Sequence, residues 1–268
     1  MPQKKDVSPT LRPPLKWAGG KRWLVSELVK IFSQYKKRRL VEPFSGGLSV
    51  ALGLEPKSAL LNDSNTELIN FYKALRAGLV IKSSMKNSRR EYLQARTRFN
   101  RLVKAADAKS AKERASLFYY LNRTGFNGLC RFNSAGEFNV PFGKYERINY
   151  LYDFRGYKNT FKEWEFVCGD FSSLKVKKND FLYVDPPYDV EFTKYSKGDF
   201  KWEDQIRLVK WLATQRCPIV ASNQATPRIL KLYRSHGFKV RTLPAPRRIS
   251  CTGDRTPALE MLATKNIP

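Results

Sequence analysis

Histidine is almost absent from this sequence of 268 residues, and its scarcity excludes several kinds of chemistry. His236 is the only histidine, which excludes Ser-His and Cys-His nucleophile pairs and most zinc sites. The four cysteines are far apart and form no Cys-x-x-Cys pattern, so a metal or redox motif of that type is excluded. We expect them to be free thiols: Cys130, Cys168, Cys217 and Cys251.

Long apolar runs are also missing. No stretch reaches the roughly 18 apolar residues that cross a bilayer, and the first ten residues are polar rather than a signal peptide. A basic amphipathic helix with bulky apolar anchors, which binding to a membrane surface requires, is not evident either. The sequence therefore predicts a soluble, cytoplasmic protein with no membrane partner.

Acidic residues are few in relation to basic ones. The chain has 24 Asp and Glu against 50 Lys and Arg, a formal net charge of +26 and a pI near 10.0. A charge of this size favours a polyanionic partner, and nucleic acid is the natural choice. The 42% apolar content is enough for a folded core, so the basic residues belong to a globular protein.

The most informative motif is Asp185-Pro186-Pro187-Tyr188, directly after the apolar run 181–184. The run predicts a buried strand, and the two prolines end it. Ligands of open α/β sheets bind at the carboxyl ends of strands. A carboxylate, a carbonyl and an aromatic face at this place suit a planar heterocycle with an exocyclic amino group, because the oxygens accept its N–H groups. This arrangement predicts methyl transfer to an amino group, although a strand that ends in a simple turn shows the same residues.

A second set of signals lies near the N-terminus. Residues 39–44 are expected to form a strand, Ser45-Gly46-Gly47 a sharp turn, and 48–54 a helix. A second strand over 58–61 precedes Asp63, which lies nineteen residues after Phe44, close to the offset of an acid that binds ribose hydroxyls. Neither phosphate-binding glycine pattern occurs, so a cofactor with ribose but no phosphate, such as S-adenosylmethionine, fits better.

The α/β pattern is interrupted and then resumes. Helical periodicity covers 68–75, and two polar, basic helices are expected near 84–104 and 110–121. Strands are expected again at 165–168, 181–184 and 219–221, with two more near 238–243 and 259–263. The interruption of about eighty residues predicts a domain inserted into an α/β core.

Taken together, these motifs resemble the Dam-type DNA adenine-N6 methyltransferases of the D12 class. The resemblance is carried, in the family's order, by Lys16-Trp17-Ala18-Gly19-Gly20-Lys21, by Val41 to Gly47, by Asp63, by the block 122–143 and by Asp185 to Tyr188. The block 122–143 is more specific than any pair of glycines. Two departures are Leu48, where a glycine is common, and Phe126, where a tyrosine is frequent.

The resemblance implies a seven-stranded, Rossmann-like core that binds S-adenosylmethionine, with an inserted, mainly helical target-recognition domain that carries a β-hairpin. Residues 1–76 and 163–268 would form the catalytic domain, and 77–162 the domain that binds double-stranded DNA. The usual target is the adenine of GATC, which such enzymes flip out of the duplex. The resemblance also implies a cytoplasmic, nucleoid-associated enzyme of a bacterium or phage, without a metal or an obligate protein partner.

The same resemblance assigns roles to individual residues. Catalysis falls to Asp185, Pro186 and Tyr188. Cofactor binding falls to Trp17, Lys21, Phe44, Ser45, Gly46, Gly47, Asp63, Asp170 and Phe171. DNA contacts fall to Lys16, Arg123, Phe126, Asn127, Leu129, Arg131, Asn133 and Pro141.

Alternatives from other classes stay open at this point. An RNA adenine-N6 or a DNA cytosine-N4 methyltransferase would share the cofactor turn, and a non-catalytic DNA-binding protein could use the same fold. Serine rather than aspartate usually opens the cytosine-N4 motif, and intact Asp185 and Tyr188 speak against a dead enzyme. The sequence does not distinguish a restriction-modification enzyme from an orphan or phage-encoded one.

Overall fold

The computed structural model describes residues 11–81, 85–189, 200–246 and 258–268. Cys251 lies outside these residues, and Cys130, Cys168 and Cys217 are free thiols. Contacts between residues divide the chain into two compact units. The first unit comprises Met1–Val25, Gly46–Glu55 and Asn65–Phe166, and the second comprises Ser26–Ser45, Pro56–Ser64 and Val167–Pro268. The predicted division by function, 1–76 with 163–268 against 77–162, stays a prediction.

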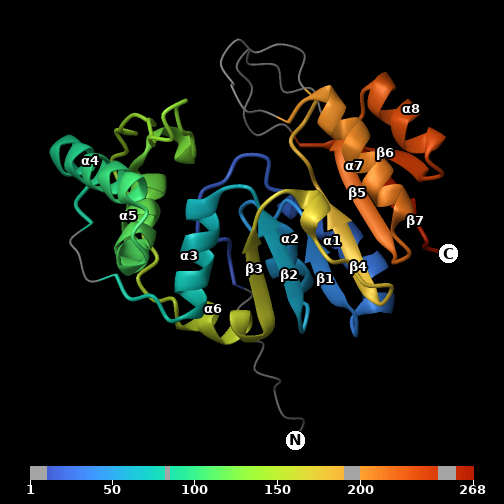
Figure 1. Cartoon of the computed structure of the whole chain (residues 1–268), viewed down its shortest axis with the longest axis horizontal. Helices are drawn as coiled ribbons and strands as arrows, with labels where there is room; N and C mark the ends of the chain where they lie inside the picture. The colour runs from blue at the N-terminus through green and yellow to red at the C-terminus, as the bar shows by residue number, and fades with distance from the viewer. Residues whose placement is uncertain (1–10, 82–84, 190–199, 247–257) are drawn as a thin grey trace, which may run out of the picture. The chain divides into compact units, whose positions relative to one another are not determined.

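One seven-stranded sheet organises the fold, with strand order β3-β2-β1-β4-β5-β7-β6 (Figure 1). The pairs β1–β2, β1–β4 and β4–β5 are parallel, whereas β7 is antiparallel to both of its neighbours. The strands are β1 (Arg39–Glu42), β2 (Ala59–Asp63), β3 (Trp164–Cys168), β4 (Asp180–Val184), β5 (Ile219–Gln224), β6 (Lys239–Ala245) and β7 (Ala258–Lys265). Each predicted strand is thus confirmed, with shifts of one to three residues at the ends.

Eight α-helices accompany the sheet in the described residues. They are α1 (Val25–Phe32), α2 (Ser49–Leu54), α3 (Thr66–Arg76), α4 (Arg89–Ala105), α5 (Ala111–Thr124), α6 (Arg155–Thr160), α7 (Trp202–Thr214) and α8 (Pro227–Ser235). The helix expected near 84–104 begins later than predicted, because the Ser88 hydroxyl accepts the Glu91 amide at 3.2 Å and so caps α4. The next helix, α5, continues beyond the predicted 121 to Thr124 and ends at Gly125.

The second unit is built around the sheet. Leu182 and Val184 of β4, with Ile219 and Ala221 of β5, form one buried cluster with apolar residues of α7 and α8, so these helices cover one face (Figure 1). Phe181 points to the opposite face, since side chains alternate along a strand, and its ring lies 5.1 Å from that of Phe32 in α1. Strand β4 is therefore buried on both sides, as its apolar run 181–184 predicted.

The first unit has a separate, largely aromatic core. Phe71 of α3 stacks on Tyr119 of α5 at 5.8 Å, and Phe118 of α5 lies 6.1 Å from Phe99 of α4. All four rings are fully buried. The β-hairpin expected after α5 consists of two isolated antiparallel bridges, Gly125 with Phe142 and Phe132 with Phe138, rather than regular strands.

Leu48 occupies the position where the resemblance led us to expect glycine, and its backbone explains that preference. Its φ of 60° and ψ of 23° are left-handed, and its side chain is fully buried at the start of α2. A left-handed conformation costs a residue with a Cβ about 1–2 kcal/mol. The burial of the leucine side chain offsets this cost.

We expect Leu48→Gly to be more stable than Leu48→Ala by about 1 kcal/mol, the reverse of the order usual in helical positions. Both variants lose the buried side chain, worth about 2–5 kcal/mol, but only glycine relieves the backbone. Urea unfolding of both variants and the wild type measures the difference. An alanine variant as stable as the glycine variant would show that Leu48 is not strained.

Candidate functional site

The Asp185 carboxylate lies directly after the buried strand β4 and is held by the neighbouring strand. The Ser222 hydroxyl of β5 donates to Asp185 Oδ1 at 3.0 Å, and the Tyr183 hydroxyl lies 2.9 Å from the same serine oxygen. Tyr183 is buried, and burial, followed by the nearby negative charge of Asp185, raises its pKa well above the usual value. Tyr183 therefore remains protonated, and the three polar groups form a chain that orients the carboxylate.

The Tyr188 ring is anchored at its hydroxyl end. The hydroxyl donates to Glu260 Oε2 of β7 at 2.6 Å, and Glu260 is 2% exposed. The tyrosine itself keeps 37% of its surface exposed. The hydroxyl end of the ring thus has a fixed position, and the ring keeps an accessible surface on which an aromatic ligand can stack.

The backbone between these two side chains is also fixed. The Pro187 carbonyl accepts a hydrogen bond of 2.8 Å from the amide of Gln205 in α7, and Asn223 of β5 donates to that same glutamine at 3.0 Å. Gln205 and Asn223 are both fully buried. Within the part of the chain that the structure describes, no donor lies on the carbonyl of Pro186.

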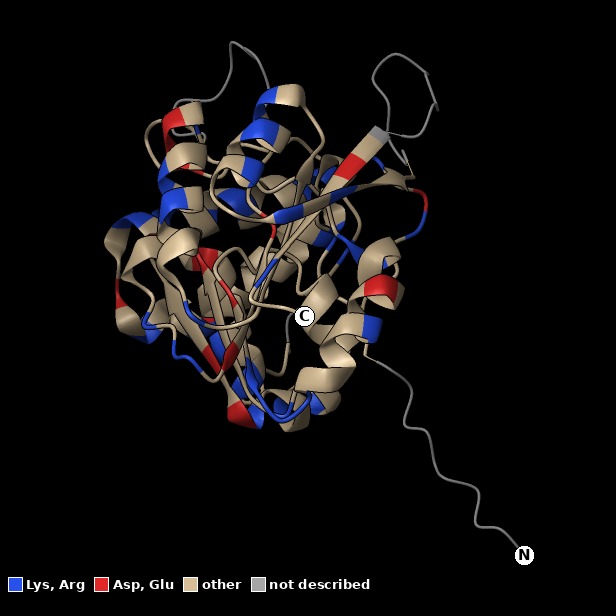
Figure 2. Cartoon of the chain, turned by 90° about the vertical axis from the view of Figure 1, so that its right-hand side faces the viewer, with Lys and Arg blue, Asp and Glu red and all other residues tan. Residues whose placement is uncertain are grey.

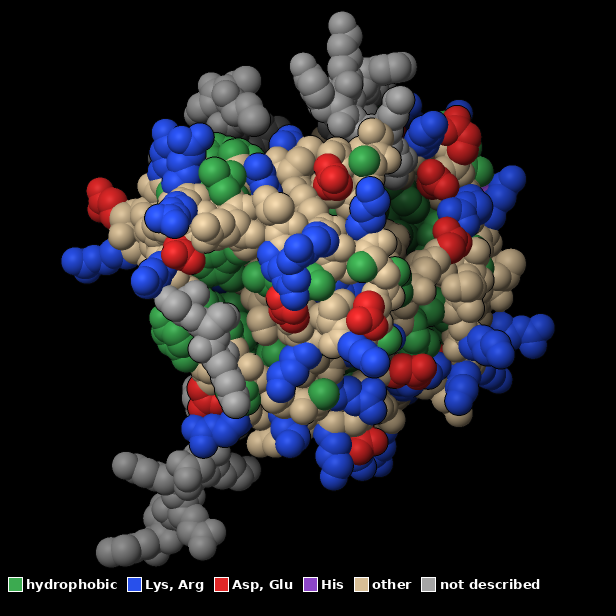
Figure 3. Space-filling view, turned by 60° about the vertical axis from the view of Figure 1, so that its left-hand side comes forward, with side chains coloured by type: hydrophobic (Ala, Val, Ile, Leu, Met, Phe, Trp, Pro, Cys, Tyr) green, Lys and Arg blue, Asp and Glu red, His purple; other side chains and the backbone are tan. Residues whose placement is uncertain are grey.

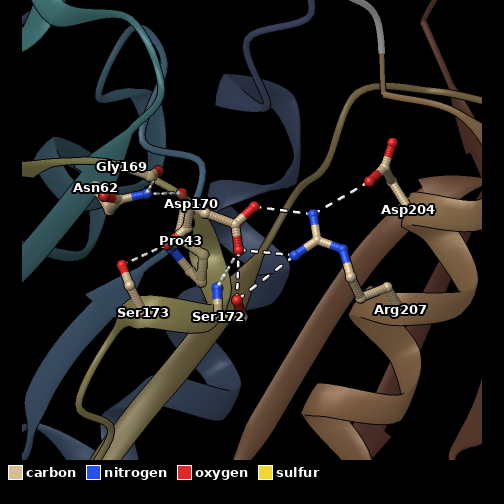
Figure 4. A network of polar contacts seen from close by, with 8 residues as sticks. All are labelled: Pro43, Asn62, Gly169, Asp170, Ser172, Ser173, Asp204 and Arg207. Atoms are coloured by element: carbon tan, nitrogen blue, oxygen red, sulfur yellow. Dashed lines mark hydrogen bonds and ion pairs between the residues drawn. The ribbon is translucent and has the colours of Figure 1, made fainter.

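Three neighbouring strand ends meet at Asn62 of β2 (Figure 4). Its side-chain amide donates to the Pro43 carbonyl after β1 at 2.8 Å and to the Gly169 carbonyl after β3 at 3.0 Å. Its own carbonyl accepts the Ser45 amide at 2.8 Å. Asn62 therefore fixes the backbone of the two turns, after β1 and after β3, that carry predicted cofactor-binding residues.

The carboxylate of Asp170, a predicted cofactor ligand, is engaged by the protein itself. Arg207 of α7 donates to its two oxygens at 2.7 and 2.8 Å, and Arg207 also contacts Asp204 at 3.1 Å (Figure 4). These hydrogen bonds, followed by those from Ser172, hold the pKa of Asp170 far below its usual value. The guanidinium lies 4.3 Å from the centre of the Phe171 ring, so one arginine orders both Asp170 and Phe171.

Aromatic rings surround the same strand ends. Phe44 lies 5.7 Å from Phe171 and 5.4 Å from Phe200 between ring centres. Asp63 ends β2, is half-buried, and accepts the Gly169 amide on its carbonyl at 3.2 Å. The second unit thus brings together an acid and several aromatic rings, a set that suits an adenosine.

The remaining predicted cofactor-binding residues belong to the first unit. Trp17 packs on the glycine turn, where an added Cβ at Gly46 would lie 2.8 Å from its indole nitrogen, and one at Gly47 would lie 2.6 Å from its Cβ. The absence of side chains at these two glycines makes room for Trp17, and the cofactor-binding role of Gly46 and Gly47 stays a prediction. The Tyr72 hydroxyl donates to the Gly46 carbonyl at 2.6 Å, and Lys21 is buried.

The predicted DNA-binding residues lie in and beside the segment after α5. Phe126 is 47% exposed, and its amide donates to the carbonyl of exposed Pro141 at 2.9 Å. Asn127 is exposed with a positive φ of 51°, and Leu129 is half-buried. Exposed aromatic and amide side chains are consistent with the predicted role, which stays a prediction.

Other residues of this set also serve the protein's own structure. Arg131 is exposed and donates through Nε to Asn139 at 2.8 Å, and the Asn133 side chain accepts the amides of Ala135 and Glu137 in a tight turn. Arg123 donates to the Asn149 carbonyl.

Lys16 is likewise engaged. Its ammonium group lies 3.6 Å from the centre of the Tyr145 ring. Burial, followed by the charge of Arg123, lowers the pKa of Lys16.

Lysines and arginines are widely spread over the molecule (Figures 2 and 3). In the described residues, no group of three His, Cys, Asp or Glu side chains is placed to hold a metal ion. The described helices include none that is long and apolar enough to span a membrane.

Sequence reasoning missed the residues that hold the site together. Asn62, Gln205, Ser222, Asn223 and Glu260 are all buried polar residues. The available signal was a polar side chain within an otherwise apolar strand, as in the run Ile219–Gln224. Arg207 gave no such signal, because basic residues on exposed helix faces are abundant here.

The comparisons with known proteins agree with the motifs. The family model of D12 class N6 adenine-specific DNA methyltransferases matches residues 17–245. A DNA adenine methylase of Vibrio cholerae is 34% identical over 270 residues, which cover 93% of this chain and 94% of that protein. A retron DNA adenine methylase of Escherichia coli is 32% identical over 93% of this chain and 90% of its own length.

A DNA N-6-adenine-methyltransferase of Escherichia phage P1 is 38% identical over 89% of this chain, but the match spans only 33% of the phage protein. A solved tRNA methyltransferase of Aquifex aeolicus shares 9% identity with a TM-score of 0.38, covering 92% of this chain and 68% of that one, a likeness too distant to argue from. The predicted family, enzyme class and seven-stranded α/β core are confirmed, and the inserted target-recognition domain stays a prediction. The chain belongs to the D12 class of N6 adenine-specific DNA methyltransferases.

Proposed function

We propose that this protein transfers a methyl group from S-adenosylmethionine to N6 of adenine in double-stranded DNA, with GATC as its site. The observation that carries the proposal is the Asp185 carboxylate at the end of β4, oriented by Ser222 at 3.0 Å and followed by the anchored ring of Tyr188. Family membership supports the reaction class, and the net charge of +26 supports a nucleic-acid substrate.

The chemistry follows from what adenine requires. Its exocyclic amino group is a weak nucleophile, because the nitrogen lone pair is delocalised into the ring. The Asp185 carboxylate and the Pro186 carbonyl would accept hydrogen bonds from the two N6–H groups and favour a tetrahedral nitrogen with a localised lone pair. One of these two protons would leave the nitrogen after it gains the methyl group. Because Ser222 orients the carboxylate in advance, the acceptor need not reorganise during the reaction.

Tyr188 would hold the base after it leaves the duplex. Flipping a base costs a few kcal/mol of stacking and pairing, which an aromatic side chain offsets by stacking on the extruded base. The hydrogen bond of Tyr188 to Glu260 fixes the position of the hydroxyl end of the ring, while 37% of the residue stays exposed. A phenylalanine would keep the stacking surface but lose the anchor.

The residues at the strand ends fit the proposed cofactor. S-adenosylmethionine, when bound, supplies an electrophilic methyl group on a sulfonium. Asp63 is a suitable acceptor for ribose hydroxyls, and Phe44 and Phe171 offer apolar ring surface for adenine. We also propose Ser45, Asp170, Trp17, Lys21 and the Gly46–Gly47 turn as parts of the cofactor-binding set.

We propose, further, that residues 77–162 recognise DNA. Within them Arg131 would read a guanine in the major groove, Phe126 would wedge or stack, and Arg123, Asn127, Leu129, Asn133 and Pro141 would support the contact, together with Lys16. The exposure of Arg131 and Phe126 supports this assignment.

Asp185→Ala should abolish methyl transfer while largely sparing cofactor binding, because it removes an acceptor for N6 and no proposed cofactor ligand. The assay follows labelled methyl groups from S-adenosylmethionine into duplexes with and without GATC, and the bases are then separated. N6-methyladenine only in the GATC duplex, and only with the wild type, is the expected result.

Other outcomes would contradict the proposal in different ways. Label in cytosine, or in RNA offered in place of the duplex, would show that the substrate is not adenine in DNA. Label in every adenine-containing duplex would show that GATC is not the recognition site. Tight DNA binding by the wild type without any transfer would show a non-catalytic protein. Full activity of Asp185→Ala would remove Asp185 from the mechanism.

Arg131→Ala should relax site preference, since one bidentate contact to guanine discriminates by about 1–3 kcal/mol. Arg98→Ala is the matched control, because Arg98 is also an arginine of the first unit with a hydrogen-bonded partner, Glu113 at 2.7 Å. Competition binding compares GATC with scrambled duplexes. Equal losses on both duplexes with Arg131→Ala would indicate a phosphate contact instead of base reading.

Arg207→Gln should raise the KM for S-adenosylmethionine several-fold with little change in kcat, because Asp170 and Phe171 lose their common support. Because the pKa of Asp170 is lowered, its carboxylate is ionised and paired with Arg207 at both pH 6 and pH 8. The effect of the substitution on KM should therefore be the same at these two pH values. Arg155→Gln, which breaks an exposed pair with Asp153 at 2.7 Å, is the control. An unchanged KM would separate Arg207 from the cofactor site.

A further inference from the structure

Two consecutive residues of the first unit, Lys16 and Trp17, are held by two different parts of that unit. The backbone of Lys16 is held by Asn122, near the end of α5. The Lys16 amide donates to Asn122 Oδ1 at 2.9 Å, and Asn122 Nδ2 donates to the Lys16 carbonyl at 2.8 Å. Asn122 is 0% exposed. A buried side chain thus fixes both backbone groups of one residue that is 106 positions away in the sequence.

The segment after α5 touches Lys16 as well. Asn122 Nδ2 also donates to the Gly128 carbonyl at 3.2 Å. Gly128 has a φ of +61°, and a Cβ added there would lie 2.2 Å from the Cβ of Lys16. The Lys16 ammonium donates to the Arg123 carbonyl at 3.2 Å. The segment that follows α5 is called here the DNA-recognition segment, because it holds most of the proposed DNA contacts. At Gly128 it packs on Lys16 without space for a side chain.

Trp17 is held by the glycine turn. The added Cβ atoms at Gly46 and Gly47 would collide with the indole and with the Trp17 Cβ, as given above, and Tyr72 fixes the Gly46 carbonyl at 2.6 Å. One peptide bond separates the residue that the recognition segment holds from the residue that packs on the turn. Because the peptide plane is rigid, a displacement of the Lys16 backbone moves Trp17.

We propose that Asn122 is a positioning residue that couples the DNA-recognition segment to the glycine turn through Lys16 and Trp17, so that DNA and cofactor change each other's affinity. The proposal rests on the proposed function, because it takes the segment as a DNA site and the turn as a cofactor site. Coupling between two ligands is reciprocal: DNA changes the affinity for cofactor by the same factor as cofactor changes the affinity for DNA.

A coupling factor distinguishes this role from a merely structural one. A variant that only loosens the fold weakens the binding of both ligands. It leaves unchanged the ratio of the cofactor affinities measured with and without DNA. Asn122→Ala removes three hydrogen bonds from the link, and its expected effect is on that ratio. Asn122→Asp keeps the acceptor for the Lys16 amide and loses the donors, so it should give an intermediate ratio.

The chain offers a matched control in Asn100 of α4. Its side chain holds the backbone of Phe138 in the same two-way manner, with an accepted bond of 2.9 Å and a donated bond of 3.1 Å. Asn100→Ala therefore removes a clamp of the same kind from the recognition region. It leaves the contacts of Lys16 and Trp17 in place, and the coupling factor should not change.

The experiment is calorimetric titration of the full-length protein with S-adenosylhomocysteine, which carries no methyl group to transfer, with and without a saturating GATC duplex. We expect the duplex to change the Kd of the wild type at least about fivefold, at the lower end of typical coupling. The factor should fall to near one in Asn122→Ala, remain in Asn100→Ala and be intermediate in Asn122→Asp. The last variant keeps the test usable if Asn122→Ala does not fold.

The contrary results are distinct. If the wild type binds both ligands independently, or if Asn122→Ala keeps the full factor, the coupling proposal is overturned while the proposed function stands. Loss of the factor in Asn100→Ala would show that general loosening, and not the Lys16–Trp17 link, changes it. Failure of the wild type to bind either ligand would overturn the proposed function itself.

Discussion

The parallel pairing of β4 with β5 is the constraint on which the site depends. Its register places Val184 opposite Ala221, so the residues that follow these two, Asp185 and Ser222, meet at the carboxyl edge of the sheet. A shift of one residue would turn each of these side chains to the other face. Burial of both faces by α1, α7 and α8 specifies the register, and the position of the acid is thereby a consequence of core packing.

Polar groups accompany this apolar packing wherever a strand ends. Asn62, Gln205, Ser222 and Asn223 are buried, and each makes hydrogen bonds to the backbone or to another polar side chain. A buried polar group without a partner costs about 1–3 kcal/mol, so the network tolerates few other arrangements. The same bonds that satisfy these groups hold the carboxylate, the proline backbone and the turns with the proposed cofactor-binding residues in single orientations.

Sequence patterns predicted the parts of the site that depend on local order. Apolar runs followed by Gly46-Gly47, by Asp63 and by Asp185 indicated strand ends, and the strands lie where they were expected. Contacts between distant residues were beyond such patterns. The bond of Asn122 to Lys16 joins positions 106 apart, and the Arg207–Asp170 pair joins positions 37 apart. No local periodicity encodes either contact, since each joins a helix to a residue of a distant loop.

The tight contact at Gly128 has a consequence for mutational scans of the proposed recognition segment. Any side chain at this position meets Lys16 and must also adopt a positive φ, so every substitution should be selected against irrespective of the DNA sequence offered. An intolerant position inside a DNA-reading loop would ordinarily be scored as a determinant of sequence choice. Here its intolerance reports steric fit within the protein, and a reprogramming library gains nothing by varying it.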